Sequence, residues 1–202
     1  MVAIIDYGVG NLFSLKSSLA EIGAEAVVTS DAEVIAAADR VILPGVGAFG
    51  DAAAKLCESG MDEIVKREAA RNKPVMGICL GMQLLFDKGY EYGEHDGLGL
   101  IKGSVRPIAD VIPGDYKIPH IGWNALKFKK ESPLFKYTKE GDYVYFVHSF
   151  YAADCEESTI AVTEYGADLT AAVGRGSVYG CQFHPEKSGA AGLNILRAFM
   201  EL

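Results

Sequence analysis

The first half of the chain alternates short apolar runs with longer segments in which apolar residues recur at helical spacing. The apolar runs, which predict buried strands, cover residues 2–5, 26–29, 40–43 and 75–78. The segments between them predict helices over residues 11–23, after Asp31, over residues 49–72 with a break at Gly60, and over residues 80–86. Strands and helices that alternate through short loops are typical of a mostly parallel sheet covered by helices on both faces.

The second half of the chain is dominated by β-type runs. A glycine-rich stretch over residues 89–103 predicts a loop, and strand-like runs follow at 104–107, 125–128, 143–147, 159–164, 169–173 and 178–182. An amphipathic segment over residues 190–200 predicts a terminal helix. We therefore expect one α/β domain over residues 1–202, with a mostly parallel central sheet, flanking helices and an antiparallel β extension of flavodoxin-like character.

Composition narrows the classes of function. The 202 residues carry 27 acidic and 19 basic side chains, and this net charge of −8 argues against nucleic-acid binding, which calls for basic surfaces. No run approaches the roughly 20 apolar residues of a membrane span, and the first residues lack the basic region of a signal peptide. None of the four cysteines forms a C-x-x-C pair, so we expect a cytoplasmic protein with reduced thiols, no metal site and no cofactor.

Cys79 lies between Gly77 and Gly81, where a predicted strand gives way to a predicted helix. Gly-x-nucleophile-x-Gly is the pattern of a nucleophile elbow, here with sulfur in place of oxygen. Such a sharp turn requires small flanking residues, because a Cβ on either side would collide with the chain. The N–H groups at the start of the helix favour thiolate over thiol. The alternative is that Cys79 is a small buried apolar residue, as most free cysteines are.

A cysteine nucleophile needs a base, and His184 has the most suitable context of the four histidines. It directly follows a predicted strand, and Pro185 biases it toward an extended conformation. Residues two apart in an extended segment project to the same side, so Glu186 can orient the imidazole. The other three fit different settings: His95 a solvated loop, His120 a structural turn, and His148 a strand end with no carboxylate close in sequence.

Acyl transfer also requires an oxyanion hole. The N–H of Leu80, directly after the nucleophile, is one natural donor. The second donor is expected from another loop at a strand end, and the Pro-Gly-Val-Gly segment at residues 44–47 fits. A plain glycine turn and a phosphate cradle are the alternatives for this segment, although a P-loop would require a following Gly-Lys-Ser/Thr.

Together these motifs resemble the class I (triad) glutamine amidotransferases, whose signatures are Gly-x-Cys-x-Gly and His-Pro-Glu. Further segments are similar to the glutaminase subunits of imidazole glycerol phosphate synthase, an enzyme of histidine biosynthesis. These segments are Asp-Tyr-Gly-Val-Gly-Asn at 6–11, Pro-Gly-Val-Gly at 44–47, Pro-His-Ile-Gly-Trp-Asn at 119–124 and Tyr-Phe-Val-His-Ser at 145–149. The resemblance runs the length of the chain, and the triad shows no departure from the pattern.

The resemblance implies hydrolysis of L-glutamine to L-glutamate and ammonia through a thioester on Cys79. It implies His184 and Glu186 as the acid–base pair, and Leu80 and Val46 as oxyanion donors, the latter after a backbone flip. The implied substrate contacts are Gly47, Gln83, Ser149 and Phe150. Ammonia would pass to a separate cyclase subunit in a heterodimer, whose interface we expect at Asn11, Trp123, Tyr145 and Lys187.

Three other functions stay open on the sequence alone. A stand-alone cysteine hydrolase or peptidase would use the same elbow without a partner. A non-catalytic binding subunit would require a broken triad, whereas this triad is complete. A sister glutaminase, such as that of pyridoxal phosphate synthase, is the nearest rival in chemistry, and the Pro-Gly-Val-Gly loop argues against it.

Overall fold

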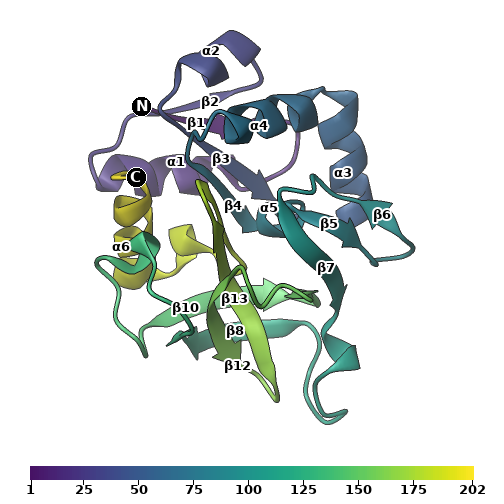
Figure 1. Ribbon diagram of the computed structural model, residues 1–202. Coiled ribbons are helices and arrows are strands. Elements are labelled where there is room, and N and C mark those ends of the chain that lie inside the picture. The colour runs from purple at the N-terminus through teal and green to yellow at the C-terminus, as the bar shows by residue number, and fades with distance from the viewer.

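The computed structural model describes residues 1–202, and its centre is an eight-stranded sheet (Figure 1). Five strands of this sheet run parallel: β2 (Ala26–Thr29), β1 (Val2–Ile5), β3 (Arg40–Gly45), β4 (Val75–Cys79) and β14 (Val178–Cys181). Three antiparallel strands continue it: β13 (Asp168–Arg175), β12 (Thr159–Glu164) and β9 (Lys127–Phe128). The strand order is β2-β1-β3-β4-β14-β13-β12-β9, which confirms the predicted parallel sheet with an antiparallel extension.

Helices cover both faces of the parallel part of this sheet (Figure 1). They are α1 (Leu12–Glu21), α2 (Ala32–Ala37), α3 (Phe49–Glu58), α4 (Met61–Ala70) and α6 (Gly189–Phe199). Alternate residues of β1 enter different cores, since Ala3 and Ile5 pack with α3 and α4, whereas Val2 and Ile4 pack with α1 and α6. Burial on both faces explains why the parallel strands are continuous apolar runs in the sequence. None of the helices is long and apolar enough to cross a membrane.

Two smaller sheets lie beside the central one (Figure 1). The first is an antiparallel ribbon of β8 (His120–Ala125) and β10 (Tyr143–His148). The second has the order β11-β7-β5-β6 and is formed by β11 (Phe150–Ala153), β7 (Ile101–Pro107), β5 (Phe86–Gly89) and β6 (His95–Asp96). The 3₁₀ turns η1 (Ile108–Asp110), η2 (Pro133–Phe135) and η3 (Pro185–Lys187) complete the fold.

The helix expected over residues 80–86 is much shorter in the structure. It is the single turn α5 (Leu80–Gln83), and Phe86 already belongs to β5. The carbonyl of Leu84 accepts the N–H of Leu98, and that of Leu85 accepts the N–H of Ile101, so these carbonyls bond to a distant segment instead of the next helical turn. The stretch expected to be a loop therefore contributes β6 and the start of β7 to a sheet.

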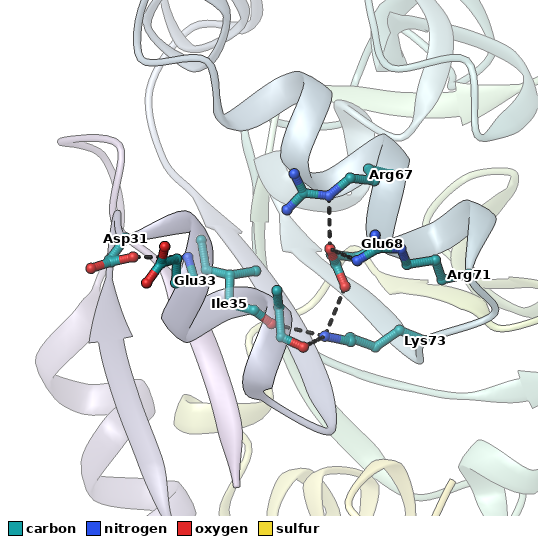
Figure 2. A network of polar contacts seen from close by, with 8 residues as sticks. Asp31, Glu33, Ile35, Arg67, Glu68, Arg71 and Lys73 are labelled. Atoms are coloured by element: carbon teal, nitrogen blue, oxygen red, sulfur yellow. Dashed lines mark hydrogen bonds and ion pairs between the residues drawn. The ribbon is translucent and has the colours of Figure 1, made fainter.

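The buried carboxylate of Glu68 is the centre of a polar network that connects α2, α4 and the segment before β4 (Figure 2). Glu68 is fully buried and forms ion pairs with Arg67, Arg71 and Lys73 at 3.0, 3.2 and 2.8 Å. Lys73 also donates to the carbonyls of Ile35 and Ala36 in the last turn of α2, each at 2.8 Å. Burial raises the pKa of Glu68, but the hydrogen bonds from its cationic partners outweigh this and leave the pKa below its usual value. The network therefore stabilises a charged carboxylate that holds two helices in place.

Candidate active site

Cys79 sits at the sharp turn from β4 into α5, with φ of 55° and ψ of −115°. Positive φ is unfavourable for a residue other than glycine, and it persists here because the neighbouring chain is tightly fitted. A Cβ on Gly81 would lie 1.9 Å from the carbonyl oxygen of Leu43, and a Cβ on Gly77 would lie 2.5 Å from that of Gly81. Both flanking glycines are therefore required sterically, and the elbow inferred from the sequence is present.

His184 follows β14 and directly precedes the η3 turn, and its side chain is almost completely buried together with that of Glu186. The Nδ1 atom of His184 lies 2.8 Å from Oε1 of Glu186. Burial lowers the pKa of His184, but interactions with Cys79 and Glu186 outweigh it and raise the pKa to about 9. Oε2 of Glu186 is buried without a hydrogen-bond partner, so the positive imidazolium is the group that compensates this carboxylate.

A second histidine, His148, faces the same pocket, but its surroundings favour the neutral imidazole and not the imidazolium. Burial, together with nearby His120 and His184, lowers the pKa of His148 to about 3, although a hydrogen bond to the carbonyl of Phe150 acts in the opposite direction. His148 is therefore neutral at working pH and cannot replace His184. His120, expected in a turn, lies in β8 and is 3.0 Å from His148, because Nδ1 of His120 and Nε2 of His148 share a hydrogen bond.

The loop that follows β3 reaches the pocket beside Cys79. Pro44 lies just before this loop, near the end of β3, and its carbonyl accepts a hydrogen bond from the buried hydroxyl of Tyr7 at 2.9 Å. Val46 is 42 % exposed, and no hydrogen bond within the protein occupies its N–H. Gly47 has φ of +96°, a value that few other residues tolerate. The loop thus offers a free N–H on a hinge of glycines.

These elements enclose a pocket of about 320 Å³. Its lining residues are Val46, Gly47, Cys79, Leu80, Gln83, Glu91, Pro119, Val147, His148, Ser149, Phe150 and His184. The structure therefore brings together the nucleophile, the histidine, both oxyanion candidates and all four expected substrate contacts. Glu186 lies behind His184 rather than in the pocket wall. The residues that line the pocket include a nucleophile, an acid–base group and candidate N–H donors, which are the groups that catalysis of acyl transfer requires.

Two polar residues of the site were not identified from the sequence. Oε2 of Glu91 accepts the N–H of Phe49 at the start of α3 at 2.7 Å, and Glu91 lines the pocket. Gln182 is fully buried, and its Nε2 lies 3.8 Å from Sγ of Cys79. Gln83 donates from Nε2 to Oε1 of Gln182 at 2.9 Å. Gln182 directly precedes the Phe-His-Pro-Glu motif, and that position is the only local signal that could have indicated it.

Three of the four expected interface residues form one cluster on the surface. Trp123 and Tyr145 face each other across β8 and β10 with ring centroids 6.0 Å apart. Nζ of Lys187 lies 6.0 Å from the centre of the Tyr145 ring. Asn11 caps the start of α1, although its side chain makes no capping hydrogen bond, and α1 contacts the η3 turn that carries Lys187.

Comparison with known proteins agrees with this geometry. The family described as glutamine amidotransferase class-I matches residues 3–202. Imidazole glycerol phosphate synthase subunit HisH of Caldanaerobacter subterraneus subsp. tengcongensis is 50 % identical, over 100 % of this chain and 98 % of that protein. The subunit HisH of Wolinella succinogenes is 49 % identical, over 100 % of both chains.

Solved structures show the same fold at low identity. A crystal structure of a glutamine amidotransferase is 20 % identical with a TM-score of 0.77, covering 100 % of this chain and 98 % of that one. The PurLQS structure from Thermotoga maritima contains a chain that is 20 % identical with a TM-score of 0.75, covering 99 % of this chain and 97 % of that one. With the full-length identities above, these findings place the chain: it belongs to the class-I glutamine amidotransferase family, in the HisH branch.

Proposed function

We propose that this chain is the glutaminase subunit of imidazole glycerol phosphate synthase and supplies ammonia for histidine biosynthesis. The observation that carries the proposal is that the elbow Cys79 and His184, which is paired with buried Glu186, line one pocket together with Leu80 and Val46. Full-length identity to HisH relatives supports this glutaminase over a sister such as that of pyridoxal phosphate synthase.

In the proposed reaction, His184 starts as the imidazolium, because its raised pKa keeps the proton on the ring at neutral pH, and the attacking form of Cys79 is the thiolate. The thiolate attacks the side-chain carboxamide carbon of glutamine, and the N–H groups of Leu80 and, after a backbone flip, of Val46 stabilise the oxyanion. His184 gives its proton to the departing nitrogen, so ammonia leaves and a glutamyl thioester remains. His184 then takes a proton from water, which attacks the thioester, releases glutamate and restores the thiolate.

The pocket wall supplies acceptors for the α-ammonium group of glutamine. Gln83 uses Nε2 to bond the Phe150 carbonyl and Gln182, so its Oε1 is the atom that remains for substrate. Glu91 adds a carboxylate on the same wall. Gly47, Ser149 and Phe150 line the remaining surface, where we place the α-carboxylate.

The proposed partner is the cyclase subunit, bound in a heterodimer. The cluster of Trp123, Tyr145 and Lys187 lies on and beside the ribbon of β8 and β10, whose end carries His148 into the pocket. The same ribbon exposes 58 % of Ile121 and 60 % of Tyr143. Exposed aromatic and apolar side chains gathered on one element are typical of a protein–protein interface.

The proposal treats residues 1–202 as one glutaminase domain in the cytoplasm. The pocket is built from the ends of β3, β4 and β14 in the large sheet and from the segment joining β10 to β11, so neither part has the site alone. All four cysteines are free thiols, as a reducing compartment requires.

The proposal is tested by glutamate and ammonia release from glutamine, with the purified chain and the cyclase subunit together. Cys79→Ala should abolish both products, while exposed Cys57 provides the control, because Cys57→Ala should leave the rate unchanged. A glutamine-like diazoketone should label Cys79 alone. Full activity in Cys79→Ala, or labelling of another cysteine with Cys79 protected, would refute the proposal.

A further inference from the structure

The orientation of two buried amides beside Cys79 follows from hydrogen-bond accounting. The carbonyl of Phe150 can only accept, so the atom of Gln83 that lies 3.2 Å from it must be the NH₂ nitrogen. That same nitrogen lies 2.9 Å from a side-chain atom of Gln182, which must therefore be the amide oxygen. The other end of Gln182, 3.8 Å from Sγ of Cys79, is then an NH₂ donor.

The reverse orientations are excluded by like groups facing each other. If the amide of Gln182 alone were rotated by 180°, its NH₂ group would face the NH₂ group of Gln83. Its oxygen would then face the sulfur of Cys79, where no hydrogen bond to a thiolate is possible. Turning both amides would place the oxygen of Gln83 against the carbonyl of Phe150. Gln83 and Gln182 are 5 % and 0 % exposed, so such mismatches would be buried without compensation from bulk water.

Both ends of this chain of hydrogen bonds are fixed by the backbone. The Phe150 carbonyl also accepts a hydrogen bond from Nδ1 of His148 at 2.8 Å, so both of its lone pairs are used. At the other end, the backbone N–H of Gln182 donates to the carbonyl of Ala171 on β13 at 2.8 Å. The donor that faces Cys79 is therefore held in place before any substrate enters.

We propose that Gln182 is a further catalytic residue, whose amide N–H binds the sulfur of Cys79 and stabilises the thiolate, and that Gln83 is the positioning residue that aims it. The inference rests on the proposed function, in which Cys79 is the nucleophile. An N–H donor binds an anion more strongly than a neutral acceptor, so this contact favours thiolate over thiol. The thiolate exists twice in the cycle, before attack on glutamine and again when the thioester breaks down. Gln182 acts at both points.

The test measures the rate at which iodoacetamide alkylates Cys79 of the full chain from about pH 5 to about pH 10, followed by mass spectrometry, because only the thiolate reacts. Gln182→Leu keeps a similar volume but removes the donor. We expect its pH profile to move up by about one unit, with alkylation about tenfold slower at neutral pH. Gln182→Met, which is also close in volume and has no N–H donor, should move the profile in the same direction. Gln83→Leu should give a smaller shift, because the donor remains but is no longer aimed.

Thr163→Val is the matched control, since it removes another fully buried polar group, whose hydroxyl donates to the Ala125 carbonyl at 3.0 Å away from the pocket. Its alkylation profile should match the parent. A profile that stays in place in Gln182→Leu or in Gln182→Met, while Cys79 of the parent is alkylated normally, overturns the role of Gln182 alone. Parent protein that reacts at Cys57 and not at Cys79 overturns the nucleophile assignment, and the proposed function with it.

Discussion

His184 and His148 show how neighbouring groups assign different tasks to the same side chain. Burial lowers the pKa of both imidazoles. His184 faces a carboxylate and the sulfur of Cys79, which reverse the effect of burial and raise its pKa to about 9. His148 faces a carbonyl and two other histidines, and its pKa falls to about 3. The acid–base residue is therefore selected by the charges around it and not by its distance from the pocket.

The raised pKa of His184 predicts how stability and activity depend on pH. Because the folded pKa is about 9 and the ordinary value is 6.5, the stabilisation is fully present below pH 6.5 and is lost as the pH rises through 9. The proton needed by departing ammonia disappears over the same upper range. We therefore expect kcat/KM to fall on an alkaline limb near pH 9.

Glu186→Gln tests this assignment, because it removes a negative charge that holds the proton on His184. The pKa of His184, followed by NMR, should fall, and the alkaline limb should move toward neutral pH. Glu164→Gln on the exposed end of β12 is the control and should leave both unchanged. Equal profiles for Glu186→Gln and the parent would show that Glu186 does not orient the histidine.

At the scale of elements, the loop after β3 depends on glycine, because the positive φ of Gly47 allows the backbone conformation in which the Val46 N–H is presented to substrate. Gly47 has φ of +96° and open space where a Cβ would stand, and Gly176 in the β13–β14 turn has φ of +58° and equally open space. Alanine at either position should destabilise the fold by about 1–2 kcal/mol through backbone strain alone. Gly47→Ala should in addition hinder presentation of the Val46 N–H and lower kcat by about 10²-fold. Urea unfolding and glutamine hydrolysis separate the two effects. If Gly176→Ala lost as much activity, general destabilisation would explain both variants.

The elements that the sequence predicted well are those whose pattern is local. Residues 26–29 and 159–164 are strands with the expected bounds, and the helix break falls at Gly60, which is left-handed. The predicted end of α5 was wrong, because apolar residues such as Leu84 and Leu85 fit a buried helix and a buried strand equally well. The helix ends where it does because the carbonyls of these two residues accept hydrogen bonds from residues 98–101. Gln182 and Glu91 gave no comparable signal, since each acquires its role from a partner 99 or 42 residues away.

At the scale of the whole molecule, the pocket lies where the large sheet meets the smaller sheets. Cys79, His184 and the loop of Val46 come from the carboxyl ends of parallel strands, where ligands of open α/β sheets bind. His148, Ser149 and Phe150 enter from the ribbon side. The surface cluster of Trp123, Tyr145 and Lys187 lies on and beside that ribbon, so a partner docked there would contact an element that forms the pocket wall.

This arrangement predicts that the isolated chain is a poor glutaminase and is activated by its partner. A loop with one oxyanion donor turned away loses roughly 10²–10³ in rate, about 2.7–4 kcal/mol. A partner that binds the productive conformation more tightly by that amount restores the rate. The measurement is glutamate release in three arms: the chain alone, with the cyclase subunit, and with the cyclase and its phosphoribulosyl aminoimidazole carboxamide substrate. We expect the rate to rise at each step.

The variant Trp123→Ala tests the interface. It should require more cyclase for the same activation and leave the rate of the isolated chain unchanged, because Trp123 is 51 % exposed and lies outside the pocket. Equal rates in all three arms would refute the switch and indicate a stand-alone amidase.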